Sequence, residues 1–216
     1  MNKEWSEKNK KMQTLIGKEA TFRKGIDVLM ELREDLFQQI TSIVNEYPSE
    51  VFWQMPYPKA EGYHSKTLAY SMWHIFRIED IVAHTVILQD SQILFTDNFL
   101  ERTGSPIITT GNELKGEGIV DFSKQLDVKA VYEYCAAVKK STDEMLKNLE
   151  YKELKRKFSD EDKKRVADSH TVSTDEDAVW LIDYWCDKDI RGLVKMPFSR
   201  HWIMHIEAMG RIKNKL

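Results

Sequence analysis

Cysteine is scarce in this chain of 216 residues, which contains only Cys135 and Cys186. Each cysteine falls inside a segment with helical spacing. Two such residues indicate neither a disulfide framework nor a cysteine-based metal motif. We therefore interpret both side chains as buried free thiols.

The sequence also lacks an excess of positive charge and long apolar runs. Lysine and arginine number 32 against 35 acidic residues, a formal net charge of −3, which argues against general nucleic-acid binding. The mean hydropathy is −0.51. No stretch approaches the roughly 18 to 20 apolar residues of a membrane span, and the N-terminus has no apolar signal core. We expect a cytoplasmic protein that binds neither nucleic acid nor membranes.

Glycine and proline are few, with 9 and 5 residues. Hydrophobic residues make up 42% of the chain and charged residues 31%, which excludes a disordered or collagen-like protein. At about 150 residues per domain, the length predicts a single domain over 1–216, with 1–17 as an N-terminal extension.

What the sequence does have is helical periodicity. Apolar residues recur at spacings of three, four and seven, while strands are scarcely indicated. The pattern predicts long helices over 15–44, 65–88, 127–149 and from Pro197 to the C-terminus. It predicts short helices over 97–102 and 175–191, the second ended by Gly192. The fold class is therefore all-α, a four-helix bundle whose connections at 92–126 and 151–175 are long crossovers.

Two histidines, His201 and His205, lie four residues apart on the last predicted helix. Residues at this spacing share a helix face, so two imidazoles can reach one metal ion. The same face carries Met204, Ala208 and Ile212, which indicates that it is turned inward.

A third histidine, His74, lies in the middle of the apolar helix 65–88. A lone histidine there would be interpreted as a hydrogen-bonded core residue, but an inward-facing pair on another helix makes it the natural third ligand. His84 lies ten residues further on, about 15 Å along a helix, and cannot reach the same ion. His64 and His170 are predicted to be solvated, with His64 able to edge the mouth of a pocket.

Other chemistries find little support in the sequence. A di-iron site needs two Glu-x-x-His motifs on facing helices, whereas the chain has one, from Glu61 to His64, in a segment rich in proline and glycine. There is no Gly-x-Ser-x-Gly turn for a nucleophilic serine and no glycine-rich phosphate loop.

The segment LAYSMWHIFRIED, with His74, and the segment FSRHWIMHIEAMGR, with His201 and His205, resemble the histidine-bearing helices of the DinB/YfiT-like superfamily of metalloenzymes. The segment ERTGSPIITTGNEL, followed by VYEYCAAVKKSTDEML, is similar to the loop and third helix of such proteins. The resemblance covers residues 18–216.

The resemblance implies a bundle of up-down-down-up type, a homodimer, and a divalent nickel, zinc or iron ion held by three histidines. Carried over by position, these are His74, His201 and His205. Relatives include low-molecular-weight-thiol S-transferases and a mycothiol-dependent isomerase, although many members have no established reaction. The charged stretch 151–175 and residues 1–17 depart from the compact members.

Two functions follow as hypotheses. The first is catalysis, in which the ion lowers the pKa of a bound thiol or water. By resemblance we favour transfer of a small cellular thiol to an electrophilic substrate over hydrolysis, with Tyr70 as a candidate to hydrogen-bond the substrate. The second is a stress-induced binding protein with a structural metal, for which Asp183 or Asp187 would supply the fourth ligand.

A homodimer is also expected from the residues themselves. The chain has 6 tryptophans and 9 phenylalanines, and helix 65–88 is apolar nearly all round, so part of this surface should meet a partner chain. The alternative is that the long loops, with Phe52, Trp53, Phe95 and Phe99, cover that helix within one chain.

Overall fold

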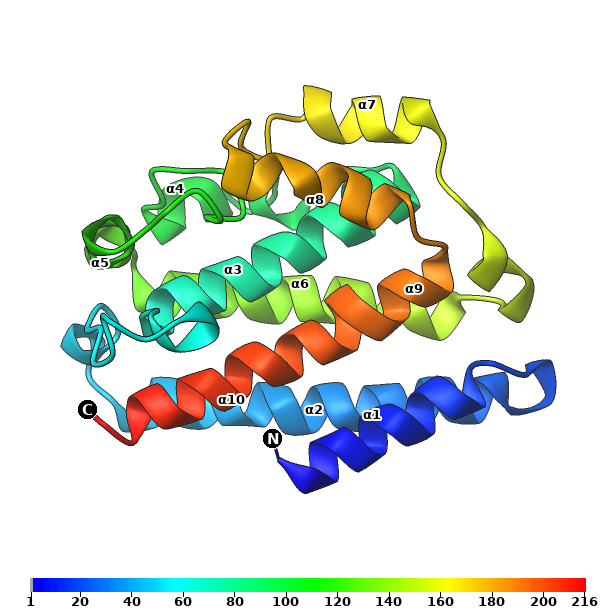
Figure 1. Cartoon of the computed structure of the whole chain (residues 1–216), viewed down its shortest axis with the longest axis horizontal. Helices are drawn as coiled ribbons and strands as arrows, with labels where there is room; N and C mark the ends of the chain where they lie inside the picture. Colours follow the sequence, from blue (N-terminus) through cyan, green and yellow to red (C-terminus); the bar gives the residue numbers. More distant parts are fainter. Residues whose placement is uncertain (1) are drawn as a thin grey trace.

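The computed structural model describes residues 2–216, and its regular secondary structure is all helical, as the sequence predicts. No strand occurs in this range, which contains only an isolated bridge between Lys157 and Asp189. Figure 1 shows long helices packed side by side, with shorter helices along one edge.

The N-terminal segment is a helix of its own, α1 (Lys3–Leu15), packed antiparallel along α2 (Phe22–Glu46) (Figure 1). The turn between them includes η1 (Glu19–Thr21), so the single helix predicted over 15–44 begins later than Leu15. Gly25 permits the close contact of the two helices, because a Cβ there would lie 2.6 Å from Cγ2 of Ile16. Helix α1 thus packs on the domain through most of the segment 2–17, which the interpretation as an extension did not anticipate.

The central helix α3 (Leu68–Asp80) continues into the π-helix η4 (Ile81–Leu88). Short 3-10 turns precede it, η2 (Ser49–Val51) and η3 (Gly62–His64). The helix begins where the sequence supplies an N-cap, because the Thr67 side chain accepts a hydrogen bond from the Tyr70 N–H. Every residue of α3 is buried within the single chain.

The predicted crossover 92–126 contains more helix than expected. It folds into η5 (Ile93–Phe95), α4 (Phe99–Thr103) and α5 (Glu117–Gln125), joined by an irregular loop over 104–116. The next helix is α6 (Val128–Asn148), and its N-cap is Asp127 as predicted, because the Asp127 carboxylate accepts a hydrogen bond from the Ala130 N–H.

The charged stretch 151–175 is likewise partly helical, with η6 (Tyr151–Lys155) and α7 (Asp160–Asp168). Each contributes one apolar side chain to the core, Leu154 and Val166, so the segment is not simply solvated. The prediction of Gly192 as a helix terminator is wrong, because α8 (Glu176–Cys186) ends earlier and Gly192 lies inside α9 (Ile190–Lys195).

The C-terminal helix α10 (His201–Lys213) is preceded by a π-helical turn, η7 (Met196–Arg200). Pro197 is tolerated in the first turn of η7, where its missing N–H is not needed. Helix α10 contacts both α2 and α3, and α6 contacts the same two helices from the other side. This packing places the middle of α3 against the first turns of α10.

No helix in the described part of the chain has both the length and the apolar character needed to cross a membrane. The homodimer stays a prediction, but its argument from helix 65–88 does not hold. Phe52 and Phe99 are buried with α3 in the same chain, whereas Trp53 and Phe95 are exposed, so two of the four loop rings cover that helix.

Candidate metal centre

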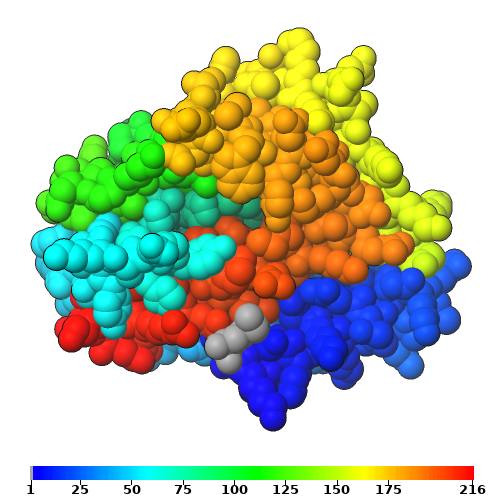
Figure 2. All heavy atoms as spheres, in the orientation of Figure 1, coloured from blue at the N-terminus to red at the C-terminus, as the bar shows by residue number. Residues whose placement is uncertain are grey.

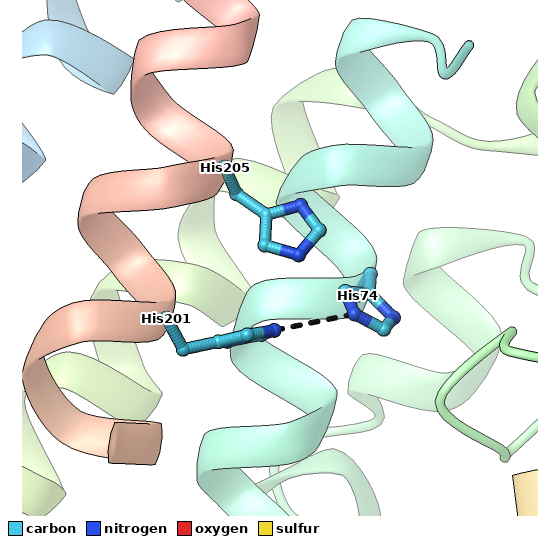
Figure 3. A group of neighbouring side chains, drawn as sticks. All are labelled: His74, His201 and His205. Carbon is cyan, nitrogen blue, oxygen red and sulfur yellow. Dashed lines mark hydrogen bonds between the residues drawn. The ribbon is translucent and has the colours of Figure 1, made fainter. Parts of the chain in front are cut away.

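The structure brings together the three histidines that the sequence singled out. His74 lies in the middle of α3, and His201 and His205 lie on the first turns of α10 with their rings directed at it (Figure 3). All three are buried, and one nitrogen from each lies within 4.8 Å of the others. The cluster is therefore close enough to hold one metal ion.

Nε2 of His74 and Nε2 of His201 lie 3.3 Å apart. Two ligands about 2.0 to 2.1 Å from one ion, at a tetrahedral angle, lie about 3.3 to 3.4 Å apart. This pair thus already has the separation of two zinc ligands.

The π-turn η7 ends at Arg200, immediately before the first histidine of α10. A π-turn holds more residues per turn than an α-helix, so it changes the rotation at which the next helix continues. The turn therefore helps to set the face of α10 that carries His201 and His205 toward α3.

Hydrogen bonds leave much of this cluster unsatisfied. Nδ1 of His201 and both ring nitrogens of His205 are buried without a hydrogen-bond partner. Burial lowers the pKa of His74 to about 4 and the pKa values of His201 and His205 well below their ordinary value, and the neighbouring histidines lower those two further. The rings are therefore neutral near pH 7 and keep lone pairs that a metal can use.

His74 is held by a backbone strap over residues 108–111, whose four successive carbonyls each accept a hydrogen bond from an α3 side chain. Thr110 O lies 2.9 Å from Nδ1 of His74, which makes Nδ1 the protonated nitrogen and leaves the Nε2 lone pair facing α10. The other carbonyls accept from Tyr70 Oη, Trp73 Nε1 and Arg77. Sequence reasoning missed this strap, whose only signal was the regular row of donors on α3.

Tyr70, the candidate catalytic residue, is part of the support. Its hydroxyl donates to Gly111 O at 3.0 Å, and its ring stacks on His74 with centroids 5.5 Å apart. Burial, with a contribution from Glu113, raises the pKa of Tyr70. The side chain lines the cavity but its proton is engaged by the strap, which favours positioning of His74 over proton transfer.

A cavity of about 420 Å³ opens onto the three histidines. Figure 2 shows this side of the molecule hollowed between the segment before α3, the helix α8 and the start of α10, with α3 at the base. Helix α8 contributes an aromatic and apolar wall, made of Trp180, Leu181, Tyr184 and Trp185. Sequence analysis connected helix 175–191 to the site only through Asp183 or Asp187 and did not predict this aromatic wall.

The proposed carboxylate ligands point elsewhere. Asp183 and Asp187 are exposed and both pair with Lys163 Nζ, at 2.7 and 2.8 Å. Within residues 2–216, the group able to hold an ion contains the three histidines and no carboxylate. The prediction of either aspartate as a fourth ligand is therefore wrong.

The remaining histidines do not join the cluster. His84 is buried and fully partnered, with Nδ1 2.6 Å from Asp90 Oδ1 and Nε2 3.1 Å from Ser141 Oγ. This is the order of a catalytic triad, but Ser141 lies inside α6, where the neighbouring backbone N–H groups are used by the helix and cannot stabilise an oxyanion. His170 is exposed, and His64 is half-buried beside Arg211.

Compared with known proteins, the chain matches no family model and no curated protein.

Proposed function

We propose that His74, His201 and His205 bind one divalent metal ion and that the protein is a metal-dependent enzyme. Its favoured reaction is transfer of a low-molecular-weight thiol to an electrophilic small molecule. The observation that carries the proposal is the set of buried, unpartnered imidazole nitrogens at the base of an open cavity. Membership of the DinB/YfiT-like superfamily and its up-down-down-up bundle belong to the same proposal.

A metal ion fits these residues better than a hydrogen-bond network does. Leaving a buried polar group unpaired costs about 1 to 3 kcal/mol, and three nitrogens of the cluster are in that condition. Imidazole suits nickel, zinc and iron, the three metals that the resemblance implies.

The number of ligands favours a catalytic over a structural ion. Structural zinc sites are closed by four protein ligands, whereas catalytic sites use three and leave a position open. Here the fourth side faces the cavity rather than a carboxylate or cysteine of the described chain. A divalent ion bound there would lower the pKa of a thiol or water, which makes either a nucleophile near neutral pH.

The chain's own residues then have defined tasks. The 108–111 strap fixes the tautomer of His74, and α8 forms an aromatic and apolar wall of the cavity. Preference for a thiol over water rests on the resemblance. Hydrolysis is the alternative outcome that an assay distinguishes.

The test compares metal-reconstituted protein with its His74→Ala variant. A simple thiol with an aromatic electrophile reports S-transfer, and an activated ester without thiol reports hydrolysis. We expect thiol consumption with the wild type only, and circular dichroism should show that the variant is folded. Equal rates for the two proteins in both assays would overturn the proposed function.

A further inference from the structure

One positively charged side chain lines the cavity without a carboxylate partner. Lys66, just before the N-cap of α3, lines the cavity together with the histidines. It is half-buried, and its Nζ lies 4.9 Å from the centroid of the Tyr70 ring. Among residues 2–216 no carboxylate lies within ion-pair distance of this ammonium group. A partly desolvated lysine in this setting is open to an anionic ligand.

The cavity itself supplies no negative charge. Its lining contains neither aspartate nor glutamate. Glu113, the acidic residue on the nearby loop, accepts a hydrogen bond from Thr109 and is not part of the lining. With a divalent ion on the three neutral histidines, the lining would carry an uncompensated charge. Burying such charge is costly unless a ligand neutralises it.

Burial lowers the pKa of Lys66, and an anion beside its ammonium group in the cavity would offset that effect.

The mouth of the cavity is aromatic. Trp180 is 48% exposed and meets Tyr184 edge-on, with centroids 5.4 Å apart. On the other side, Tyr63 is 37% exposed and lies edge-on to His205 at 4.6 Å. Exposed rings on opposite walls suit a flat, apolar body, since aromatic contacts add to the burial of apolar area.

We propose that Lys66 is a specificity-determining residue that selects a small organic acid: an aromatic or apolar body bearing one carboxylate. The carboxylate pairs with Lys66 Nζ, the body lies between the aromatic walls, and the other end reaches the histidine cluster. The inference rests on the proposed function for what that other end does, but the ion pair with Lys66 does not require the metal.

Two matched probes separate the carboxylate from the rest of the ligand. These are 4-(mercaptomethyl)benzoate and 4-(mercaptomethyl)benzamide, which have the same thiol and ring and differ in charge at the far end. Their dissociation constants are measured by calorimetry on zinc-loaded wild type, on Lys66→Met and on Lys129→Met. Lys129 is an exposed lysine on α6 and serves as the control.

We expect the benzoate to bind about tenfold more tightly than the benzamide, as one charge-assisted hydrogen bond provides, in both the wild type and Lys129→Met. In Lys66→Met the ratio should fall to about one, with the benzamide affinity unchanged. A ratio near one in the wild type, a ratio that survives Lys66→Met, or no binding of either probe would overturn the proposal.

The same titrations on chelator-treated wild type keep this inference distinct from the proposed function. If the benzoate preference persists without metal while the zinc-loaded protein shows no turnover, the ligand selection by Lys66 stands and the proposed reaction fails. If turnover occurs without any preference, the reaction stands and the role of Lys66 fails.

Discussion

Two buried polar clusters that include residues of α3 differ in whether their polar atoms have hydrogen-bond partners. The first, the histidine cluster, consists of His74, His201 and His205 and leaves three ring nitrogens without partners. The second, the charged cluster, consists of Arg33, Glu79 and Asp143. Arg33 donates to both oxygens of Glu79 at 2.7 and 3.0 Å and to Asp143 at 2.6 Å.

Each charged group of the charged cluster has hydrogen-bond partners within the chain. Trp202 Nε1 also donates to Glu79 at 2.8 Å, and the Arg33 guanidinium lies 4.4 Å from the Trp202 ring centroid. Helix α10 thus supplies a partner to the charged cluster through Trp202, next to the unsatisfied His201. Both clusters involve α3 and α10, but the charged cluster is completed by the chain, whereas the histidine cluster is open toward a cavity, where we propose that a metal ion completes it.

The largest effect should come from opening the charged cluster. Replacing Arg33 by Met leaves Glu79 buried without its cation, so we expect the free energy of unfolding to fall by about 3 to 5 kcal/mol. Urea denaturation measures this loss. Arg23→Met, at an exposed arginine on the same helix, is the control and should change stability far less. Similar losses for both variants would remove the distinction between the two clusters.

The histidine cluster should make the folding stability of the metal-free protein depend on pH. The folded pKa of His74 is about 4, below its ordinary value of 6.5, so the unfolded chain takes up the proton first. Stability is complete above about pH 6.5 and falls as the pH drops toward 4, by about 3 kcal/mol for His74 alone. Denaturation across this range measures the slope. His74→Gln should flatten it, and equal slopes in the two proteins would contradict the account.

Completing the histidine cluster with metal should stabilise the fold. At a free zinc concentration of 100 times the dissociation constant, we expect a gain of about 2.7 kcal/mol, because the ion binds the folded state. Thermal denaturation with and without zinc gives this value. His205→Ala should gain far less, while His84→Ala, which alters a fully partnered histidine, should gain as much as the wild type.

The smallest effect concerns the strap over 108–111. Trp73→Phe removes one of its hydrogen bonds, the one to Thr109 O, and keeps most of the ring packing. We expect a loss of about 1 kcal/mol in stability and weaker zinc binding, since the strap positions His74. Trp180→Phe, outside the strap, should leave zinc binding unchanged. Equal zinc affinities for the wild type and Trp73→Phe would show that the strap does not tune the site.

The histidine cluster was predictable because the features that indicate it lie within single helices. Spacing of four residues places His201 and His205 on one helix face, and the apolar surroundings of His74 indicate an inward side chain. Which helices face each other is a tertiary property, but with few long helices the choices are limited. The all-helical class followed from periodicity in the same way.

The support around the cluster was not predictable from residue types. The strap uses backbone carbonyls, which every residue possesses, so the side chains of 108–111 do not indicate its presence. The wall formed by α8 depends on how 151–175 returns to the domain, and that segment reads as polar although it buries Leu154 and Val166. Gly192 was misread because glycine is common at helix ends but is also tolerated in a short helix capped by Asp189.

The central claim is that the three histidines are a metal site, and metal content tests it most directly. Elemental analysis of protein purified without a histidine tag should find about one nickel, zinc or iron ion per chain in the wild type and in His84→Ala. It should find almost none in His74→Ala, His201→Ala or His205→Ala, because two remaining imidazoles bind far more weakly. Full occupancy after the loss of any one of the three, or a wild-type protein that takes up no metal on reconstitution, would contradict the account.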